Sequence, residues 1–403
     1  MKIRYISGSR LMYAVLAFLS CWYFYFSSTF SLRPYPQLFW IAMAALSIAI
    51  GLAHKFQLNR IDMAFFFGMF ILFMFSMFST NQVESLRVVG NYVIYYIVAR
   101  MITDNCDGKT IHSIIFFFSV VHLICLFIQV LLPSVYTSVL LPLLPASSHT
   151  MITEQMNWNA AYYGFSIQSS MSAMYLSIGA VLATLRVKTS EKRALKIVYI
   201  VLVALFVIGI FYTQRRGSSA ATLVVLMLIY MMAKGNRSSK LLFGISVVIL
   251  IAIVGIQNIP GLSGIFNKFQ TFLATGSLMN GRDSNFADAL LAISQKPFIG
   301  YGGGQVKAAM GYAWLENSFL SLAVQWGIVG AAIFFTPYIM LLKQTTRMIK
   351  QEVTDNIYIE FSIYIQILFL IISLVENYYG DPLTVFMFFT IVFTANSYWD
   401  QLV

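Results

Sequence analysis

Two apolar runs meet at a pair of arginines in the stretch IVYIVLVALFVIGIFYTQRRGSSAATLVVLMLIYMMA (residues 197–233). Each run approaches the roughly 20 apolar residues that an α-helix needs to cross a bilayer. Only helices and closed barrels satisfy every backbone hydrogen bond in lipid, and these runs lack the alternation of barrel strands. The stretch therefore predicts two membrane helices joined by a short turn that carries Arg215 and Arg216.

The rest of the chain repeats this pattern. Of its 403 residues, 59% are hydrophobic and only 10% are charged, a balance too apolar for a soluble protein of this size. Apolar runs lie roughly at 11–30, 37–53, 61–79, 86–101, 111–132, 160–185, 197–213, 218–233, 241–257, 317–342, 357–377 and 383–397. We therefore expect an all-α integral membrane protein with about 12 transmembrane helices, organised as a single polytopic domain over residues 1–403.

Basic residues are distributed unevenly among the loops between these runs. If the N-terminus is cytoplasmic, roughly 18 of the 26 Lys and Arg residues fall on cytoplasmic segments, as the positive-inside rule requires. Both termini are then cytoplasmic, and the net charge of +11 reflects membrane topology rather than nucleic-acid binding. The longest loop, at about 258–316, lies on the opposite, outer side.

This long outer loop contains the segment DSNFADALLAISQ (residues 283–295). The spacing of Phe286, Leu290 and Ile293 predicts a short amphipathic helix with these three side chains on one face. Asp283 or Ser284 is a suitable N-terminal cap, and Pro297 ends the helix. A helix of this kind can lie in the membrane interface.

Arg215 and Arg216 run against the topological trend because they lie on the outer side. A charge costs about 2.5–3.5 kcal/mol at the bilayer centre on insertion scales and less near the surface. The two side chains either reach lipid phosphates or form an anion site, since the guanidinium fork matches phosphate oxygens and stays charged. Arg282 and Arg87 are candidates to join such a site, although Arg87 can instead pair with Glu84.

A polar pair, Glu316-Asn317, opens the apolar run at 317–342. A carboxylate in a partly dry cavity has a raised pKa and can accept a proton from a hydroxyl group as a general base. The alternative is an ordinary acidic residue at the N-terminus of a helix. The sequence leaves both interpretations open.

Aromatic and acidic residues gather at two further outer positions. The turn VENYYGDP (residues 375–382) carries Glu376 and Tyr379, and the segment PFIGYGGG (residues 297–304) carries Tyr301. Tyrosine rings at such places either stack on sugars or belong to the aromatic belt of the membrane interface. The glycine segment lacks the GxxxxGK[ST] pattern of a phosphate-binding loop, so a turn returning the chain to the membrane is the simpler interpretation.

Cysteine and histidine give no sign of a metal site. The three cysteines and four histidines are scattered along the chain without ligand spacing. We therefore expect neither a metal nor another cofactor.

Three segments, in this order, resemble the O-antigen polymerase and ligase superfamily: TQRRGSS (213–219), NGRDSNFADALLAISQKPFIGYGGG (280–304) and LENSFLSLAVQWGIVGAAIFF (315–335). Members carry a Ser-Arg-Gly-like turn between two helices, a Gly-Arg start to an outer loop, a Pro-x-x-Gly-x-Gly segment and a polar pair opening the next helix. Here the turn reads Gln-Arg-Arg-Gly, so the matching arginine is ambiguous. Ligases typically have His-Asn in the last pair, and Glu316-Asn317 favours the polymerase branch.

The resemblance implies a metal-independent GT-C-type membrane glycosyltransferase in the bacterial inner membrane, with its active site on the periplasmic side. The implied substrate is an undecaprenyl-diphosphate-linked oligosaccharide, and the implied partners are membrane lipids, a chain-length regulator and a flippase. Arg215 and Arg216 would stabilise the departing diphosphate, and Glu316 would deprotonate the acceptor. The substrate-binding candidates are Arg282, Arg87, Asn317, Tyr301, Glu376 and Tyr379.

Two other functions fit parts of the sequence. A ligase would transfer the glycan to lipid A-core or to protein. A flippase of lipid-linked oligosaccharides would also need many helices and outer cations, but it should show charged residues deep in several helices and often a two-fold repeat. Neither feature is evident in the sequence.

Overall fold

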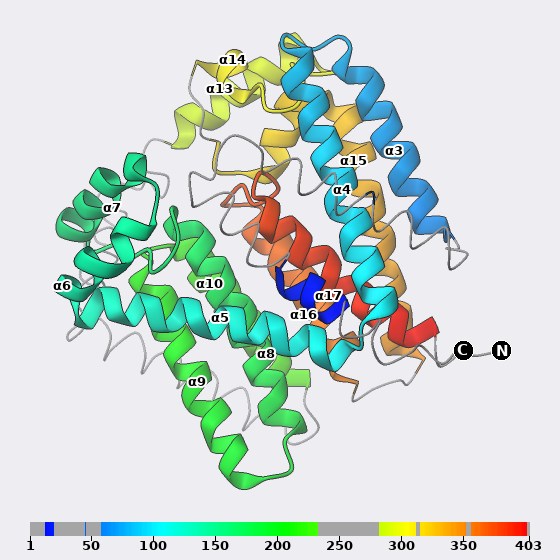
Figure 1. Cartoon of the computed structure of the whole chain (residues 1–403). Coiled ribbons are helices and arrows are strands. Elements are labelled where there is room, and N and C mark those ends of the chain that lie inside the picture. Colours follow the sequence, from blue (N-terminus) through cyan, green and yellow to red (C-terminus); the bar gives the residue numbers. More distant parts are fainter. Residues whose placement is uncertain are drawn as a thin grey trace. The chain divides into compact units, whose positions relative to one another are not determined.

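The computed structural model describes residues 13–19, 45, 58–232, 282–311, 315–351 and 356–400, and every regular element in these ranges is a helix (Figure 1). Among the described residues, four helices are long and apolar enough to cross a membrane: α5 (Gly108–Leu131), α8 (Ser169–Thr189), α9 (Arg193–Tyr212) and α15 (Ser318–Lys350). Shorter apolar helices are α10 (Arg216–Met232), α16 (Ile357–Ile372) and most of α17 (Pro382–Asp400). The expected all-α class is confirmed for these ranges.

The number of membrane helices and the GT-C architecture stay predictions. The expected runs at 37–53 and 241–257, and much of the run at 11–30, lie outside the described residues. Contacts group the chain into two compact units, which we describe separately. Unit 1 comprises residues 1–17, 35–111 and 279–403, and unit 2 comprises residues 18–34 and 112–278.

The core of unit 2 is formed by α5, α8, α9 and α10. Leu126, Leu176 and Phe206 are fully or almost fully buried there, and α8 packs closely against α9. A Cβ added at Gly179 of α8 would lie 2.6 Å from the Phe206 ring, so only glycine permits this approach. In water, burial of apolar side chains would stabilise this packing by about 25 cal/mol per Å². In lipid this contribution is absent, and the helices are held together by close van der Waals contact between small residues.

The segment between the expected runs at 111–132 and 160–185 is itself helical in unit 2. It consists of α6 (Pro133–Val135), the π-helical turn η1 (Tyr136–Leu140), the 3₁₀ turn η2 (Leu141–Leu143) and α7 (Ala146–Asn159). The run expected at 160–185 is wrong in its first part, because α8 begins only at Ser169. Ala160 and Gly164 have positive φ values of 46° and 57°, which are not helical. The chain between α7 and α8 therefore cannot continue either helix.

Unit 1 is built from α3 (Arg60–Ser76), α4 (Gln82–Asn105), α15, α16 and α17, with α4 packed on α17 and α3 on α15. Aromatic rings fill its interior. Phe65 stacks on Tyr96 with 3.8 Å between ring centroids, and Tyr338 meets Phe389 at 5.4 Å. Such ring pairs add roughly 0.5–1.5 kcal/mol each beyond the area they bury.

A buried ion pair lies at one end of α3 and α4. Asp62 is fully buried, accepts a 2.7 Å hydrogen bond from the Tyr96 hydroxyl and lies 3.6 Å from Nε of Arg100. Asp62 also completes a capping box with Asn59 at the start of α3. Because each oxygen of Asp62 has a donor, this carboxylate is tolerated in an apolar interior.

α15 is interrupted at Gly327, where φ is 68° and ψ is 176°. The glycine segment 297–304 fills the break: Tyr301 N and Gly302 N donate to the carbonyls of Val324 and Gln325 at 3.1 and 2.7 Å, and Ile328 N donates to Pro297 O at 2.7 Å. The segment thus satisfies backbone groups that the broken helix leaves open. It is a fixed part of the helix packing rather than a simple connecting turn.

The predicted amphipathic helix in the outer loop is present as α13 (Arg282–Gln295), followed by α14 (Val306–Met310). Two details of the prediction are wrong. The helix already includes Asp283 and Ser284, so neither is the residue before it that would cap it. Its buried face includes the predicted Ile293 together with Ala289 and Ala292, and the predicted Phe286 is partly buried against the same cluster, but the predicted Leu290 is 59% exposed.

Candidate functional site

The predicted turn between two apolar helices is confirmed in unit 2. α9 ends at Tyr212, and the Thr213 hydroxyl donates to Ile210 O at 2.6 Å while it accepts a longer bond, 3.4 Å, from Arg215 N. Gln214 follows with a positive φ of 59°, and α10 begins at Arg216. A left-handed non-glycine residue costs about 1–3 kcal/mol and is kept only where its surroundings enforce it. Here it sets the direction in which the two arginines leave the turn.

Arg215 is held by a serine at the start of another helix. Its Nε–H donates a 2.8 Å hydrogen bond to Oγ of Ser169, the first residue of α8, and Ser169 is only 3% exposed. A guanidinium group held at Nε has a fixed plane, which restricts the direction from which a planar or tetrahedral anion can be gripped. The geometry therefore suits an orienting contact.

Ser169 is in turn hydrogen-bonded to the phenol of Tyr163, a buried residue of the loop between α7 and α8. Burial raises the pKa of Tyr163, while the charge of Arg215 and the bond from Ser169 partly offset that rise. The phenol therefore stays neutral at physiological pH. It adds a dipole next to Arg215 but no negative charge that would cancel the cation.

The loop that carries Tyr163 is itself fixed from α5. The side-chain oxygen of Gln129, a fully buried residue, accepts hydrogen bonds from Tyr163 N at 2.8 Å and from Gly164 N at 2.7 Å. The Ser172 hydroxyl of α8 donates to the Tyr163 carbonyl. A continuous polar network thus runs from α5 through this loop to Arg215, and each buried polar group in it has a partner.

Arg216 is placed differently from its neighbour. It is the first residue of α10 and is partly exposed. The N-terminus of a helix carries a partial positive charge and N–H groups suited to anions. Two arginines and a helix start therefore form a positively charged turn, which we call the arginine turn (Thr213–Arg216).

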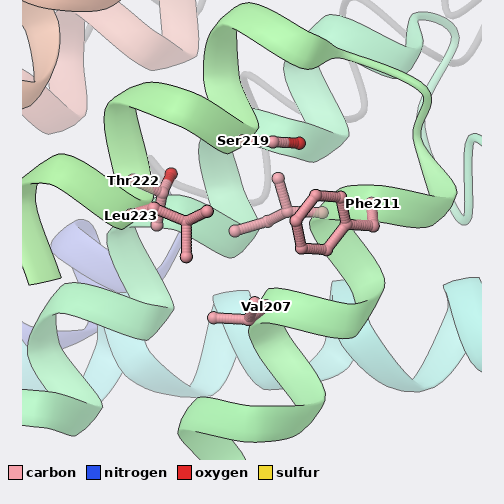
Figure 2. Close-up of a pocket in the computed structure, with 6 residues that line it drawn as sticks. Val207, Phe211, Ser219, Thr222 and Leu223 are labelled. Atoms are coloured by element: carbon pink, nitrogen blue, oxygen red, sulfur yellow. The ribbon is translucent and has the colours of Figure 1, made fainter. Parts of the chain in front are cut away.

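A small apolar recess lies between α9 and α10 behind the arginine turn (Figure 2). Its lining is Val207, Ile210, Phe211, Ser219, Thr222 and Leu223, and its empty volume is about 150 Å³. This volume includes space open to the surroundings, and the interior has no room for a water-sized molecule, whereas ligand clefts usually measure roughly 300–1,000 Å³. The hydroxyls of Ser219 and Thr222 donate to carbonyls of their own helix, at 3.0 and 2.7 Å. The recess is therefore packing space rather than a sugar site.

A second polar region lies in unit 1, at the start of α15. Asn317 is the N-cap residue: its side-chain oxygen accepts from Leu320 N at 2.9 Å, and its amide donates to Leu374 O at 2.9 Å. Glu316 directly precedes this cap and is partly exposed. Asn317 and not Glu316 is therefore the N-cap residue, and both interpretations of Glu316, a general base or an ordinary acidic residue near the start of a helix, stay predictions.

The start of α15 is tied to the turn between α16 and α17. Ser318 N donates to Ser373 O at 2.9 Å, the Ser318 hydroxyl donates to Glu376 O at 2.8 Å, and the Asn377 amide donates to Ser321 Oγ at 2.9 Å. These bonds bring the segment that carries Glu316 and the segment that carries Glu376 together. We call this pair of segments the carboxylate turns (residues 315–318 and 373–377).

Several sequence candidates have structural partners in unit 1. The Tyr379 ring is buried and packs edge-on against Phe334 and Tyr338, and its carbonyl accepts from the Tyr92 hydroxyl at 2.6 Å. Burial raises the pKa of Tyr379. Glu376 is also largely buried, with 6% exposure. Their predicted contacts with substrate are not tested by this arrangement and stay predictions.

Arg87 and Tyr301 are more exposed. Arg87 pairs with Glu84 one turn earlier in α4 at 2.5 Å, which is the alternative foreseen from their spacing. The Tyr301 hydroxyl donates to the Gln295 side chain at 2.7 Å, and the Lys296 ammonium lies 4.6 Å from the centre of its ring. Arg282 begins α13. Substrate binding by these residues stays a prediction.

Within the described ranges, no three His, Cys, Asp or Glu side chains come together as metal ligands would. His112 and His122 are buried in α5, and Cys106 and Cys125 are buried free thiols. The expectation of a reaction without metal or other cofactor stays a prediction.

Residues 200–335 match the O-antigen ligase family model. The matched region includes the arginine turn, α13, the glycine segment, Glu316 and the first half of α15. The resemblance to the O-antigen polymerase and ligase superfamily is thereby confirmed over this third of the chain. A comparison with curated proteins found no match.

Sequence reasoning missed the residues that support Arg215. Ser169, Tyr163 and Gln129 come from three separate segments of the chain. A serine at the start of an apolar run is ordinary, so no local signal distinguishes Ser169. Only tertiary packing places its hydroxyl at the guanidinium.

Proposed function

We propose that this chain is a membrane glycosyltransferase that polymerises undecaprenyl-diphosphate-linked oligosaccharide repeat units into a surface polysaccharide, an O-antigen or a capsule. The observation that carries the proposal is the partly buried contact with Ser169 that holds Arg215, a residue of the segment that matches the O-antigen ligase family. A cation fixed in this way suits a diphosphate. The match itself supports the wider class of glycan-transferring enzymes, and the polymerase branch is our inference from Glu316.

In the proposed reaction, the growing chain is linked to its lipid through a diphosphate. A hydroxyl oxygen of the incoming repeat unit attacks the anomeric carbon of the growing chain, and the bond from that carbon to the diphosphate oxygen breaks. Glu316 accepts the hydroxyl proton. The diphosphate leaves with the bonding electrons, and its new charge is stabilised by Arg215, with Arg216 in support. Direct displacement would invert the anomeric centre.

The remaining candidates have supporting roles in this proposal. Arg282, Arg87 and Asn317 would bind the diphosphate or the first sugar, and Tyr301, Glu376 and Tyr379 would line the sugar path. We place the enzyme in the bacterial inner membrane, with both termini cytoplasmic and the reaction on the periplasmic side. A flippase would supply the substrate there, and a chain-length regulator would limit the product.

A ligase is the second candidate, because the match to the family model fits a ligase as well as a polymerase. It uses the same donor diphosphate but transfers the glycan to lipid A-core or to protein. The departure at Glu316, where ligases of the superfamily typically have histidine, argues against it. Arg215 would have the same role in either enzyme.

The test uses the purified full-length protein in liposomes with a lipid-linked repeat unit as the sole substrate. Polymerisation predicts a ladder of lipid-linked products that grows with time and the release of undecaprenyl diphosphate. A ligase would give products only when lipid A-core is added. A flippase would give no new product and would move the labelled lipid between leaflets. Either of these last two results would overturn the polymerase assignment.

A further inference from the structure

The exposed side of α13 and the residues just after it carry large apolar side chains, which is unusual for a loop that faces water. Leu290 and Leu291 are each 59% exposed, and Phe298, just beyond the helix, is 70% exposed. Scattered single leucines on a surface need no explanation, but these three lie within nine residues. Phe298 is also held beside Ile328 of α15, which is 59% exposed, because Ile328 N donates to Pro297 O.

The two sides of the exposed surface of α13 differ in polarity. At 100° per residue, Leu290, Ala287 and Leu291 occupy one arc, which Asp283 joins in the first turn, and Ser284, Asp288 and Gln295 occupy the next. Ser294 lies within the apolar arc, but its hydroxyl donates to Leu291 O at 2.7 Å and therefore does not depend on water. One side of the helix suits an apolar medium and the other suits water.

The depth of this helix follows from its attachment to α15. Lys343 is exposed on α15, and the helix from Ile328 to Lys343 is only about 22 Å long at 1.5 Å per residue. The hydrocarbon core of a bilayer is about 30 Å thick. If the charged group of Lys343 marks one edge of that core, Ile328 lies inside the core, several ångströms short of the other edge.

α3 gives an independent measure of the same depth. A Cβ at Gly68 would lie 3.2 Å from Ile333, and one at Gly330 would lie 3.2 Å from Leu72, so the two helices are antiparallel and aligned. This alignment puts the exposed Arg60 at the level of Lys343. Both helices therefore present a basic residue at the same level. In the opposite direction, the end of α3 at Ser76 lies near the level of Ile328, where α15 is interrupted.

α13 is joined to α15 at this level. Ile328 N donates to Pro297 O at 2.7 Å, which holds Phe298 beside Ile328. One turn further along α15, Val324 packs with Ala289, Ala292 and Ile293 of α13. Lys296 and Tyr301, in contact at 4.6 Å, lie on the same segment, and both residue types are common where hydrocarbon meets water.

We propose that Leu290, Leu291, Phe298 and Ile328 form one lipid face, and that α13 lies in the membrane interface with this face against the hydrocarbon of one leaflet. The occupant is bilayer lipid because the face continues the exposed surface of a helix of membrane-spanning length. This inference does not depend on the proposed enzyme activity. Leu315, the neighbour of Glu316, belongs to the same apolar cluster as α13, so the carboxylate turns are anchored at the bilayer surface.

The experiment places single nitroxide labels in a variant without Cys21, Cys106 and Cys125, reconstituted in phosphatidylethanolamine and phosphatidylglycerol liposomes. Labels on Leu290→Cys, Leu291→Cys and Phe298→Cys should collide more with oxygen, which concentrates in lipid, than with a water-soluble nickel chelate. Matched labels on Ser284→Cys and Asp288→Cys, on the polar side of the same helix, should show the opposite preference.

A preference for the nickel chelate at all five positions would show that α13 faces water and would overturn the proposal. Low collision rates with both reagents, together with spin–spin broadening, would show that a second copy of the chain covers the face, which also overturns it. If a cysteine variant fails to fold, Leu291→Trp provides a second measurement. Lipids brominated on their acyl chains should quench the added tryptophan emission, and unchanged emission would contradict a lipid contact.

Discussion

The Nε–H of Arg215 donates to Oγ of Ser169 across 46 residues of sequence, at a distance of 2.8 Å. This bond converts a mobile surface cation into an oriented one, because the guanidinium plane can no longer rotate freely about its last bonds. The supporting Tyr163 is neutral, so the orientation is achieved without cancelling the charge. A side chain that only contacts lipid phosphates does not need a fixed guanidinium plane, so this orientation favours an anion site.

The first prediction concerns this contact. Arg215→Ala should lower the rate of chain growth about 10²–10³-fold, the range for losing a donor that stabilises charge in a transition state. Arg215→Lys should restore only part of the rate, since a point charge lacks the fork. Ser169→Ala should cause a smaller loss, about tenfold by the same reasoning, and Ser169→Thr should recover it because the hydroxyl remains.

Ser219→Ala is the matched control for this series. Its hydroxyl also contacts Arg215, but at the backbone carbonyl and not at the guanidinium, at 3.0 Å. The Ser219→Ala variant should keep a near-normal rate of chain growth in liposomes with lipid-linked repeat units. Wild-type rates for both Ser169→Ala and Arg215→Ala would refute a diphosphate role for this turn.

The second prediction compares two arginines on α4. Arg100 is buried against Asp62, whereas Arg87 is half exposed beside Glu84. Arg100→Ala leaves a buried carboxylate without its cation and should destabilise the protein by about 3–5 kcal/mol. Arg87→Ala breaks an exposed pair and should lower stability by at most about 1 kcal/mol. Unfolding in mixed detergent micelles, followed by circular dichroism, measures both.

The same pair of variants also separates structure from function. If Arg87→Ala loses chain growth while its unfolding midpoint stays normal, Arg87 contributes to substrate binding. Equal destabilisation by both variants would mean that exposure does not distinguish the two pairs, contrary to our account.

The third prediction concerns the glycine segment. Gly302 has a φ of 105°, and an added Cβ would lie 1.9 Å from Oγ of Ser79. Gly302→Ala should therefore destabilise the protein by at least the roughly 1–3 kcal/mol of a strained backbone, with the steric clash in addition. At Gly380 nothing lies within 4 Å of an added Cβ, so Gly380→Ala is the control and should melt within a few degrees of wild type. Equal melting of the two variants would contradict the fixed packing of this segment.

Local signals in the sequence were sufficient for the helices and for some contacts. Apolar periodicity located α9, α10 and α13, and the i, i+3 spacing of Glu84 and Arg87 anticipated their ion pair. Helix starts were less certain, because a cap depends on the backbone at one residue. This explains why Asp283 was misplaced at the start of α13 and why Asn317 rather than Glu316 caps α15.

The support of the candidate site could not be predicted in this way. The contact between Ser169 and Arg215 depends on how α8 packs against α9, and no local pattern encodes that packing. The glycine segment was also underestimated. Its role depends on the break in α15 at Gly327. In the sequence, Gly327 is one glycine within an apolar run, and nothing local predicts that Tyr301 N and Gly302 N bond to the carbonyls beside it.

The fourth prediction concerns membrane topology, which follows from the distribution of Lys and Arg. In a variant without native cysteines, Ser190→Cys, at the end of α8, should be protected in intact cells from an impermeant maleimide, because the distribution of Lys and Arg predicts that this end is cytoplasmic. Ser284→Cys in α13 should react. Labelling of Ser190→Cys from outside would reverse the topology and remove the periplasmic location of the proposed reaction.

The last prediction concerns Glu316. The residue directly precedes the Asn317 cap, so its carboxylate is not needed to begin α15. Glu316→Gln keeps the shape and removes the base. If Glu316 deprotonates the acceptor hydroxyl, chain growth should fall about 10²–10⁴-fold, while binding of the lipid-linked substrate should persist because the arginines remain. The single-turnover rate and the substrate dissociation constant should therefore respond differently.

Asn317→Ala provides the contrasting variant. It removes the cap, which typically costs about 0.5–2 kcal/mol, and its amide bond to Leu374 O. We expect Asn317→Ala to lower the unfolding midpoint and to weaken substrate binding, whereas Glu316→Gln should leave both the midpoint and the substrate dissociation constant nearly unchanged. Near-normal chain growth by Glu316→Gln, measured without added metal, would eliminate the base hypothesis and leave the arginine turn as the main catalytic element.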